Sequence, residues 1–387
     1  MSMLLRLLSN EQFKIISATQ LLIVFSVTLL SPVLPVHFKM QGMTESQIGL
    51  IMGIASLGAL VVRPWTGMSV DTKGSRAVTL FGQILVIVGL ASYFWAVGFW
   101  QYLLLRFYQG IAMAFYGTGS ITFASCVESA KNTSAAIAYF SLCTMIGMGI
   151  ATSIGPLIFA GYGFFNLIFL GLASSSIAIS LMWIRSEEAP HCSEGKRIPF
   201  GEVWKAKEVL APAVCLFGSN FALGTAFTFV PLLALSQSIA PYGFFIAFSG
   251  AVVCARTMVH QINQRWSPER TAVYASIINA MSTGLLAVYP SILTFILSGA
   301  LIGFGFGIIY PTLAAYVVDR VSPANKGSAL SVIAAAADIG NALGASVLGV
   351  VAQTMGYSVL FTGATIIILL AGYYFYKALW DDSSIVQ

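Results

Sequence analysis

The stretch VVRPWTGMSVDTKGSRAV, residues 61–78, places Arg63, Asp71, Lys73 and Arg76 between two apolar runs. Only 9% of the 387 residues are charged and 58% are hydrophobic, whereas a soluble globular chain is about 25% charged and about 45–50% apolar. The composition therefore indicates a membrane protein. The stretch itself reads as a short polar connection between two segments that cross the bilayer.

Apolar segments of spanning length recur along the whole chain, because about 20 apolar residues are enough to cross a bilayer. They predict an all-α integral membrane protein with twelve transmembrane helices. The first segment is too long for a signal-peptide core and is not followed by a small-residue cleavage site, so we expect it to be retained. The twelve segments lie at 13–37, 46–66, 77–98, 101–125, 134–160, 163–184, 209–234, 241–262, 271–290, 292–317, 327–352 and 355–377.

The basic residues predict the orientation, because Lys and Arg stay on the cytoplasmic side of a membrane. With both termini in the cytoplasm, all 19 Lys and Arg residues except Lys39 and Arg106 fall in or beside inner connections. The net charge of +5 therefore reflects topology and gives no evidence of nucleic-acid binding. We expect a multi-pass protein of a bacterial inner (cytoplasmic) membrane. The five cysteines are odd in number and predict no disulfide framework.

The longest polar interval, residues 185–208, lies near the middle of the chain. It predicts a cytoplasmic linker between an N-terminal six-helix bundle, 1–184, and a C-terminal one, 209–387. Two parallel, pseudo-symmetric halves are typical of one large class of secondary transporters. Three residue pairs at a common spacing of 193 support such a repeat: Arg63 and Arg256, Gly147 and Gly340, Gly163 and Gly356.

The sequence GMSVDTKGSR, 67–76, resembles the signature loop between helices 2 and 3 of the major facilitator superfamily. It departs from the family pattern at Thr72 and Ser75, where basic residues are usual. The resemblance implies the major facilitator fold, with an aspartate and a basic residue that latch the cytoplasmic gate and two glycines that permit close packing and a tight turn. The alternative is a positive-inside loop with an incidental aspartate. The matching gate residues are Gly67, Asp71, Gly74 and Arg76.

A second motif, RFYQG at 106–110, resembles the family's pattern of Arg, two residues, Gln and Gly. An arginine in hydrocarbon costs several kcal/mol unless it faces a cavity or a partner. We therefore expect Arg106 to engage an anion. The resemblance implies a role in substrate binding or proton coupling, and the alternative is an arginine that extends to the interface.

Asp338 is the acidic residue placed at the middle of a predicted span, in AAAADIGNALG. Helical spacing puts it on one stripe with Asn341. An apolar environment favours the protonated carboxyl group, so Asp338 is the candidate proton carrier, with Arg106 as its candidate ion-pair partner. The alternative is an aspartate that packs helices through hydrogen bonds.

The segment GMGIATSIGPLIFAG, 147–161, resembles a motif of the drug/proton antiporter branch through Gly147, Gly155 and Pro156. The resemblance implies export and a closely packed interface between the halves. It is partial, because Phe159 and Ala160 stand where the family has two glycines.

Family analogy also assigns helices 1, 4, 7 and 10 to the wall of a substrate cavity. It makes six polar residues, besides Arg106, candidates for substrate contact, and it implies no cofactor and no bound metal. These residues are Gln20, Gln109, Tyr116, Asn220, Tyr310 and Asn341.

Four short patches narrow the resemblance to bacterial exporters of opine-type metallophores, the staphylopine type: RPWTG at 63–67, QGIAMAFYG at 109–117, YPTL at 310–313 and ADIG at 337–340. Such metallophores carry several carboxylates, which Arg106 could bind. The sequence contains no phosphate loop and no zinc-protease or serine-hydrolase motif, so neither an ATP-driven pump nor an enzyme is indicated.

We therefore expect a secondary transporter that exports a small amphipathic or anionic molecule, a metallophore or a drug, by alternating access. Its partners would be the small-molecule substrate, protons and the lipid bilayer, and it would work as a monomer. A proton-coupled importer of a small nutrient and a membrane receptor that does not transport are the alternatives.

Overall fold

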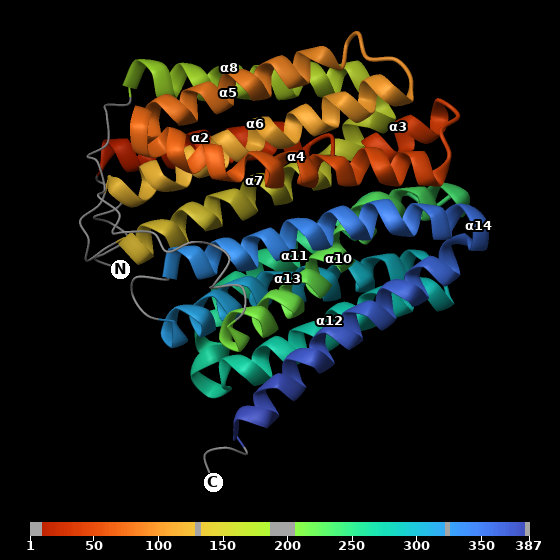
Figure 1. Cartoon of the computed structure of the whole chain (residues 1–387). Coiled ribbons are helices and arrows are strands. Elements are labelled where there is room, and N and C mark those ends of the chain that lie inside the picture. Colours follow the sequence, from red (N-terminus) through yellow and green to blue (C-terminus); the bar gives the residue numbers. More distant parts are fainter. Residues whose placement is uncertain (1–9, 128–132, 186–205, 322–325, 384–387) are drawn as a thin grey trace. The chain divides into compact units, whose positions relative to one another are not determined.

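The computed structural model describes residues 10–127, 133–185, 206–321 and 326–383, in which every regular element is a helix (Figure 1). Nine of the described helices are long and apolar enough to cross a membrane. The helices are α2 (Glu11–Thr28), α3 (Leu34–Met40), α4 (Glu45–Lys73), α5 (Ser75–Ser92), α6 (Phe99–Cys126), α7 (Thr133–Tyr162), α8 (Phe164–Arg185), α10 (Lys207–Ser236), α11 (Tyr242–Arg265), α12 (Pro268–Val288), α13 (Ile292–Arg320) and α14 (Lys326–Ser383).

The sequence predicted a loop at residues 67–76, and this prediction is wrong. Helix α4 continues to Lys73, so Gly67 and Asp71 lie in its last turns. Gly74 alone interrupts the helical backbone before α5, with φ +84° and ψ 153°, a conformation that is essentially restricted to glycine. Pro64 does not end the helix, and nothing between it and Gly74 breaks a helix.

Two other predicted boundaries differ from the structure. The first predicted span, 13–37, is divided into α2 and α3 by a turn at residues 29–33. The last two spans form the single element α14, whose backbone is helical except at Gly356, with φ 84° and ψ 174°. The chain reverses direction at this glycine (Figure 1), so α14 consists of two helical arms.

The chain forms two compact units. Unit 1 comprises Met1–His37 and Ile54–Ser193, and unit 2 comprises Phe38–Gly53 and Glu194–Gln387. The first two turns of α4 thus belong with the second half of the chain. The predicted bundles 1–184 and 209–387 stay a prediction, and most of the predicted linker, 185–208, lies outside the described residues.

The internal repeat is visible in the helix boundaries. Three helices in the first half begin 193 residues before their counterparts in the second half. Glycines with positive φ also recur at this spacing, at Gly163 and Gly356. The matched first residues are Ser75 and Pro268, Phe99 and Ile292, and Thr133 and Lys326.

Close helix contacts follow the same spacing. At Gly110 of α6, an added Cβ atom would meet the carbonyl oxygen of Ala55, and at Gly303 of α13 it would meet that of Phe248. Both glycines and both carbonyls are 193 residues apart. Glycine therefore permits the same backbone approach in each unit.

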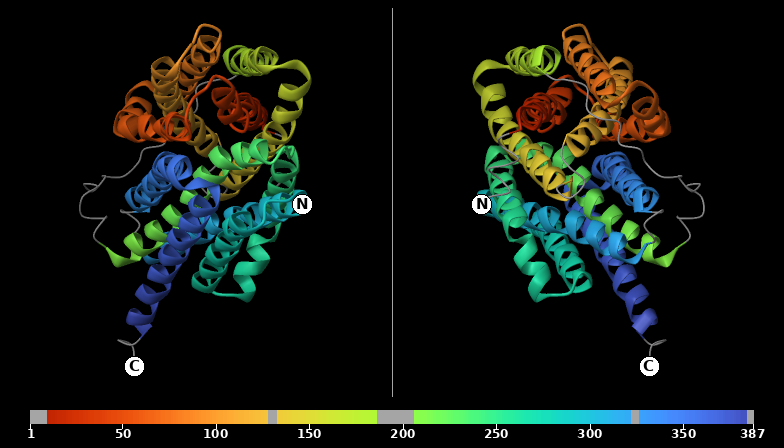
Figure 2. Two further views of the ribbon diagram at one scale, coloured as in Figure 1. Left: turned by 90° about the vertical axis from the view of Figure 1, so that its right-hand side faces the viewer. Right: turned by 90° about the vertical axis from the view of Figure 1, so that its left-hand side faces the viewer.

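In unit 1, α2 packs against α7 and α8. Gly147 and Gly155 of α7 lie against the carbonyl oxygens of Leu21 and Leu29 in and after α2, so both glycines serve packing within unit 1. The role predicted for them and Pro156 between the halves stays a prediction. Figure 2, turned by 90° from Figure 1, shows several helices of this unit close to end-on.

In unit 2, α10 packs against α14, and α11 packs against α13. The start of α4 joins this unit through polar contacts: Glu45 Oε1 accepts a hydrogen bond from Lys39 Nζ at 2.6 Å and one from Tyr357 Oη at 3.2 Å. Gly49 of α4 lies against the carbonyl oxygen of Ala345 in α14. These contacts explain why residues 38–53 belong to unit 2.

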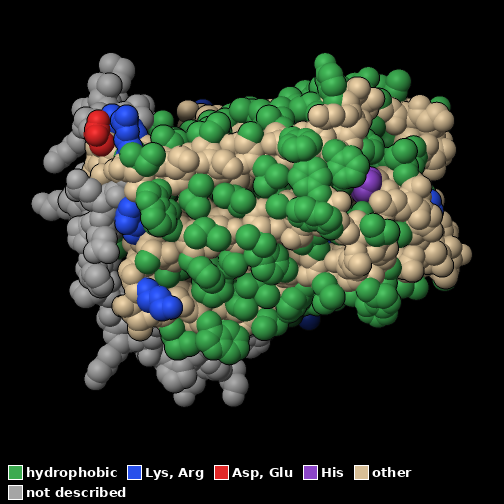
Figure 3. Space-filling view, turned by 90° about the horizontal axis from the view of Figure 1, so that it is seen from above, with side chains coloured by type: hydrophobic (Ala, Val, Ile, Leu, Met, Phe, Trp, Pro, Cys, Tyr) green, Lys and Arg blue, Asp and Glu red, His purple; other side chains and the backbone are tan. Residues whose placement is uncertain are grey.

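The surface matches a bilayer environment. Figure 3 shows one face on which apolar side chains cover the middle, while most of the visible Lys and Arg gather near one end. Large apolar side chains such as Leu104, Phe169 and Leu370 are exposed in the protein alone. Contiguous exposed apolar area of this kind marks a surface that contacts membrane or protein.

The cysteines require one correction. Cys143, Cys215 and Cys254 are free thiols, but Cys126 is disulfide-bonded. The sequence predicted no disulfide framework, and at Cys126 the structure differs from that prediction.

Candidate functional site

Arg106 is held in place by a buried amide on its own helix. Its Nη1 atom donates a hydrogen bond to Gln109 Oε1 at 3.0 Å, because residues three apart on a helix face the same side. The same oxygen accepts a hydrogen bond from Tyr93 Oη of α5 at 2.9 Å. Arg106 Nε is buried and has no hydrogen-bond partner. The guanidinium is thus fixed in position, and among the described residues of unit 1 it has no carboxylate partner.

Aromatic rings surround this arrangement in unit 1. Tyr93 packs against Tyr102 and Phe164, with ring centroids 6.2 and 6.0 Å away. The His37 ring stacks on Phe164 at a centroid distance of 3.7 Å, and its Nε2 atom lies 3.5 Å from Tyr102 Oη. Tyr93 and Tyr102 are only 1% and 2% exposed, so these rings pack in the core of unit 1 beside the Arg106–Gln109 pair.

A second polar cluster in unit 1 is closed on itself. Gln20 Oε1 accepts a hydrogen bond from Tyr116 Oη at 2.8 Å, and Gln20 Nε2 donates one to Thr144 Oγ1 at 2.8 Å. Gln20 is 7% exposed and Tyr116 is fully buried. These bonds join α2, α6 and α7 in the core of the unit, and the predicted contact of Gln20 and Tyr116 with substrate stays a prediction.

Asp338 and Asn341 lie one turn apart on α14 in unit 2, and both are half-buried. The backbone of Asn341 packs closely against Gly224 of α10. Asn220 Nδ2, also on α10, donates a hydrogen bond to the Leu216 carbonyl of its own helix at 3.0 Å. Arg106 and Asp338 belong to different units, so the ion pair between them stays a prediction.

The gate residues lie around the end of α4. Asp71 is exposed, and Arg76 Nη2 donates a hydrogen bond to the Trp183 carbonyl near the end of α8 at 3.1 Å. The structure thus ties the start of α5 to α8 through Arg76. The proposed latch itself stays a prediction.

Two residues of interest were not singled out as site residues from the sequence. Tyr93 completes the hydrogen bonds around Gln109, but a tyrosine near a helix end carries no distinctive signal. Arg256 lies on α11 inside the apolar window Tyr242–Val259, and a charge inside an apolar window is a signal that could have identified it.

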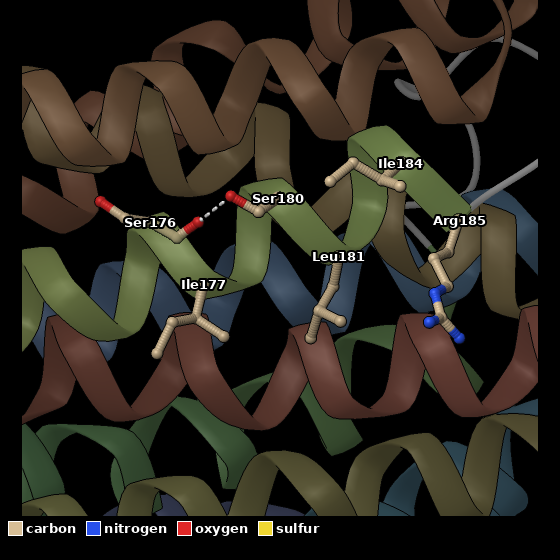
Figure 4. Close-up of a pocket in the computed structure, with 6 residues that line it drawn as sticks. All are labelled: Ser176, Ile177, Ser180, Leu181, Ile184 and Arg185. Atoms are coloured by element: carbon tan, nitrogen blue, oxygen red, sulfur yellow. Dashed lines mark hydrogen bonds between the residues drawn. The ribbon is translucent and has the colours of Figure 1, made fainter.

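A surface groove on α8 is separate from these groups. Figure 4 shows its six lining residues, all from α8, with Ser180 Oγ donating a hydrogen bond to the Ser176 carbonyl at 2.8 Å. None of the predicted site residues lines it, and its lining is mostly apolar. We do not assign this groove to substrate.

Comparison with known proteins agrees with the motifs. The family model described as Major Facilitator Superfamily matches residues 16–294 and 245–384. The chain is 25% identical over 363 residues to the staphylopine export protein of Staphylococcus aureus, which covers 88% of this chain and 90% of the relative.

Two solved structures share the fold. A mutant of the nucleoside transporter NupG has a TM-score of 0.78 at 15% identity and covers 95% of this chain and 99% of its own. The human organic anion transporter MFSD10 has a TM-score of 0.71 at 16% identity and covers 94% and 98%. At these identities the likeness concerns the fold alone.

Proposed function

Because the chain belongs to the Major Facilitator Superfamily, a family of transporters, we propose that it is a proton-coupled exporter of a small anionic or amphipathic molecule that works by alternating access. Membership makes it a multi-pass membrane protein with a small-molecule substrate. Direction, coupling ion and substrate class are the parts that we propose.

We also propose twelve spans with both termini in the cytoplasm of a bacterial inner membrane. Nine helices meet the criteria of length and hydropathy. Gly356 divides one of these, α14, into two arms, and α2 and α6 have 18 and 28 residues. Counting both arms and these two helices gives twelve.

The proposal of an anionic substrate rests on the surroundings of Arg106. Its guanidinium is fixed by Gln109, its Nε atom is buried without a hydrogen-bond partner, and aromatic rings lie beside Tyr93. A partly buried arginine within a membrane segment is costly unless a compensating group faces it. A carboxylate of the substrate would supply that anion through charge-assisted hydrogen bonds.

We assign the proton to Asp338, because it is a half-buried carboxyl group within the candidate span Ser328–Ala378. Intramembrane carboxyl groups are typical of proton relays. Asp71 and Arg76 would latch the cytoplasmic gate, and Gly155 with Pro156 would shape the interface between the halves.

We propose a multi-carboxylate metallophore as the cargo, with amphipathic drugs as the second possibility. Support comes from the similarity to the staphylopine export protein along most of both chains and from the cation at Arg106.

The test is uptake of staphylopine into inverted membrane vesicles with an acidic interior, with an amphipathic dye assayed in parallel. We expect the wild type to accumulate staphylopine only while the pH gradient lasts. Asp338→Asn should abolish accumulation but retain exchange of internal for external substrate, because it removes only the proton carrier. Asp319→Asn, an exposed aspartate near the end of α13, is the control and should behave as the wild type.

Accumulation by Asp338→Asn at an unchanged pH gradient would refute its role. Uptake by right-side-out vesicles with an acidic exterior, and none by inverted ones, would identify an importer instead. Binding without flux in either orientation would indicate a receptor.

A further inference from the structure

Unit 2 contains a cation of its own within an apolar helix. Arg256 lies on α11, inside the apolar window Tyr242–Val259, and its side chain is half-buried. Its Nε atom is buried and has no hydrogen-bond partner. In the part of the chain that the structure describes, no carboxylate pairs with it.

The burial of Arg256 is partial, because the side chain is half-buried and its Nε atom is the part that is enclosed. Arginines near the end of a spanning helix place the apolar stem in the bilayer and the guanidinium in water. In Arg256 the Nε atom of the guanidinium itself is enclosed. An arginine within a span needs a compensating group, and the described residues of unit 2 do not supply an anion for it.

The packing of α11 on α13 fixes where Arg256 lies. Gly307 of α13 approaches the adjacent residue Ala255 so closely that an added Cβ atom would meet the alanine methyl group at 2.6 Å. Gly299, Gly303 and Gly307 of α13 lie against the backbone of Phe244, Phe248 and Val252 of α11, and the same register places Tyr310, one turn after Gly307, beside Ala255 and Arg256. Tyr310 is 37% exposed, so this pair can be reached from outside the helix packing.

We infer that Arg256 and Tyr310 form an anion subsite in unit 2 that binds a carboxylate of the transported molecule. The guanidinium can donate two parallel hydrogen bonds to a carboxylate. The inference rests on the proposed function and deepens it, because a neutral or cationic drug would leave Arg256 uncompensated. Multi-carboxylate molecules should therefore bind better than their esters.

The experiment measures binding without transport. The purified full chain in detergent is titrated with tricarballylate, a propane tricarboxylate, and with its trimethyl ester, and the affinity is read by calorimetry and by thermal shift. We expect the wild type to bind the acid and not the ester. Arg256→Gln should weaken binding by about tenfold or more, which corresponds to the loss of one charge-assisted contact of about 1.5–3 kcal/mol.

Two further variants separate specific binding from net charge. Arg265→Gln, on the same helix but exposed, removes the same charge and should leave the affinity within about twofold. Arg256→Lys keeps the charge but cannot form the bidentate contact, and it should bind more weakly than the wild type and more tightly than Arg256→Gln. An unchanged melting temperature without ligand shows that each variant is folded.

Equal affinity in the wild type and Arg256→Gln would overturn the inference, and so would equal losses in Arg256→Gln and Arg265→Gln. The inference would also be overturned if the wild type bound neither tricarballylate nor staphylopine at millimolar concentration. The proposed function is tested separately. If the chain binds tricarballylate through Arg256 but moves no substrate in vesicles, the subsite is supported and the proposed export function is refuted. Conversely, if Arg256→Gln exports staphylopine as the wild type does, the proposed export function is supported and the subsite at Arg256 is refuted.

Discussion

Single side chains in this protein divide into those whose polar atoms are satisfied within a unit and those that are not. The Gln20 amide bonds Tyr116 and Thr144 in the core of unit 1, whereas Arg106 and Arg256 each keep a buried Nε atom without a partner. The sequence identified Gln20, Tyr116 and Arg106 as polar residues in apolar segments. It could not separate the two kinds, because hydrogen bonding depends on which helices become neighbours.

Tyr116→Phe should lower the free energy of unfolding by about 1 kcal/mol. It removes a buried hydrogen bond and leaves Gln20 Oε1 with the longer contact to Ser120, at 3.4 Å. Thermal unfolding in detergent measures the change, and Tyr162→Phe is the control, because Tyr162 is 75% exposed. Equal melting temperatures for Tyr116→Phe and the wild type would show that this bond does not contribute to stability.

At the scale of helices, glycines set how closely the elements approach. The spacing of apolar segments predicted most helix positions within a few residues, because hydropathy alone decides which segments enter the bilayer. It missed the continuation of α4 to Lys73 and the division of 13–37, because both depend on local backbone conformation at Gly74 and at residues 29–33. It also could not predict that α4 begins in unit 2.

Gly303→Ala should destabilise unit 2 by about 1–3 kcal/mol, because the added methyl group would overlap the Phe248 carbonyl oxygen, which belongs to a backbone that cannot rotate away. Gly250→Ala on the partner helix α11 is the matched control. No atom lies within 4 Å of its added Cβ atom, so this variant should be stabilised by up to about 1 kcal/mol. If thermal unfolding shows the same effect for both, helix propensity and not packing governs the site.

For the whole molecule, the 193-residue repeat preserves three helix starts but not the residues that cap them. Gly98 precedes α6 with φ +81°, whereas its counterpart Ser291 precedes α13 with φ −141° and forms a capping box with Thr294. The sequence revealed the repeat through three residue pairs. It did not reveal that equivalent helix starts use different backbone conformations, because those depend on how the chain enters each helix.

Exchanging these two residues should have unequal effects. Gly98→Ser should destabilise the protein by about 1–3 kcal/mol, because serine is forced into a backbone region that is essentially restricted to glycine. Ser291→Gly should cost only a few tenths of a kcal/mol, as is usual when glycine replaces a capping serine. Each variant is the other's control in thermal unfolding, and equal losses would contradict the difference in backbone conformation.

The repeat also gives a reference for evolutionary divergence. If the halves arose by duplication, mutational tolerance at any position should resemble tolerance 193 residues away wherever both residues serve the same packing, as Gly110 and Gly303 do. Positions that depart from that correlation are those at which a residue of one half acquired a function that the equivalent residue of the other half lacks. In such a comparison the position equivalent to Arg106 is Gly299, and the position equivalent to Asp338 is Met145. A saturation mutagenesis map of either half would thus locate the specialised residues by their failure to match the ancestral pattern.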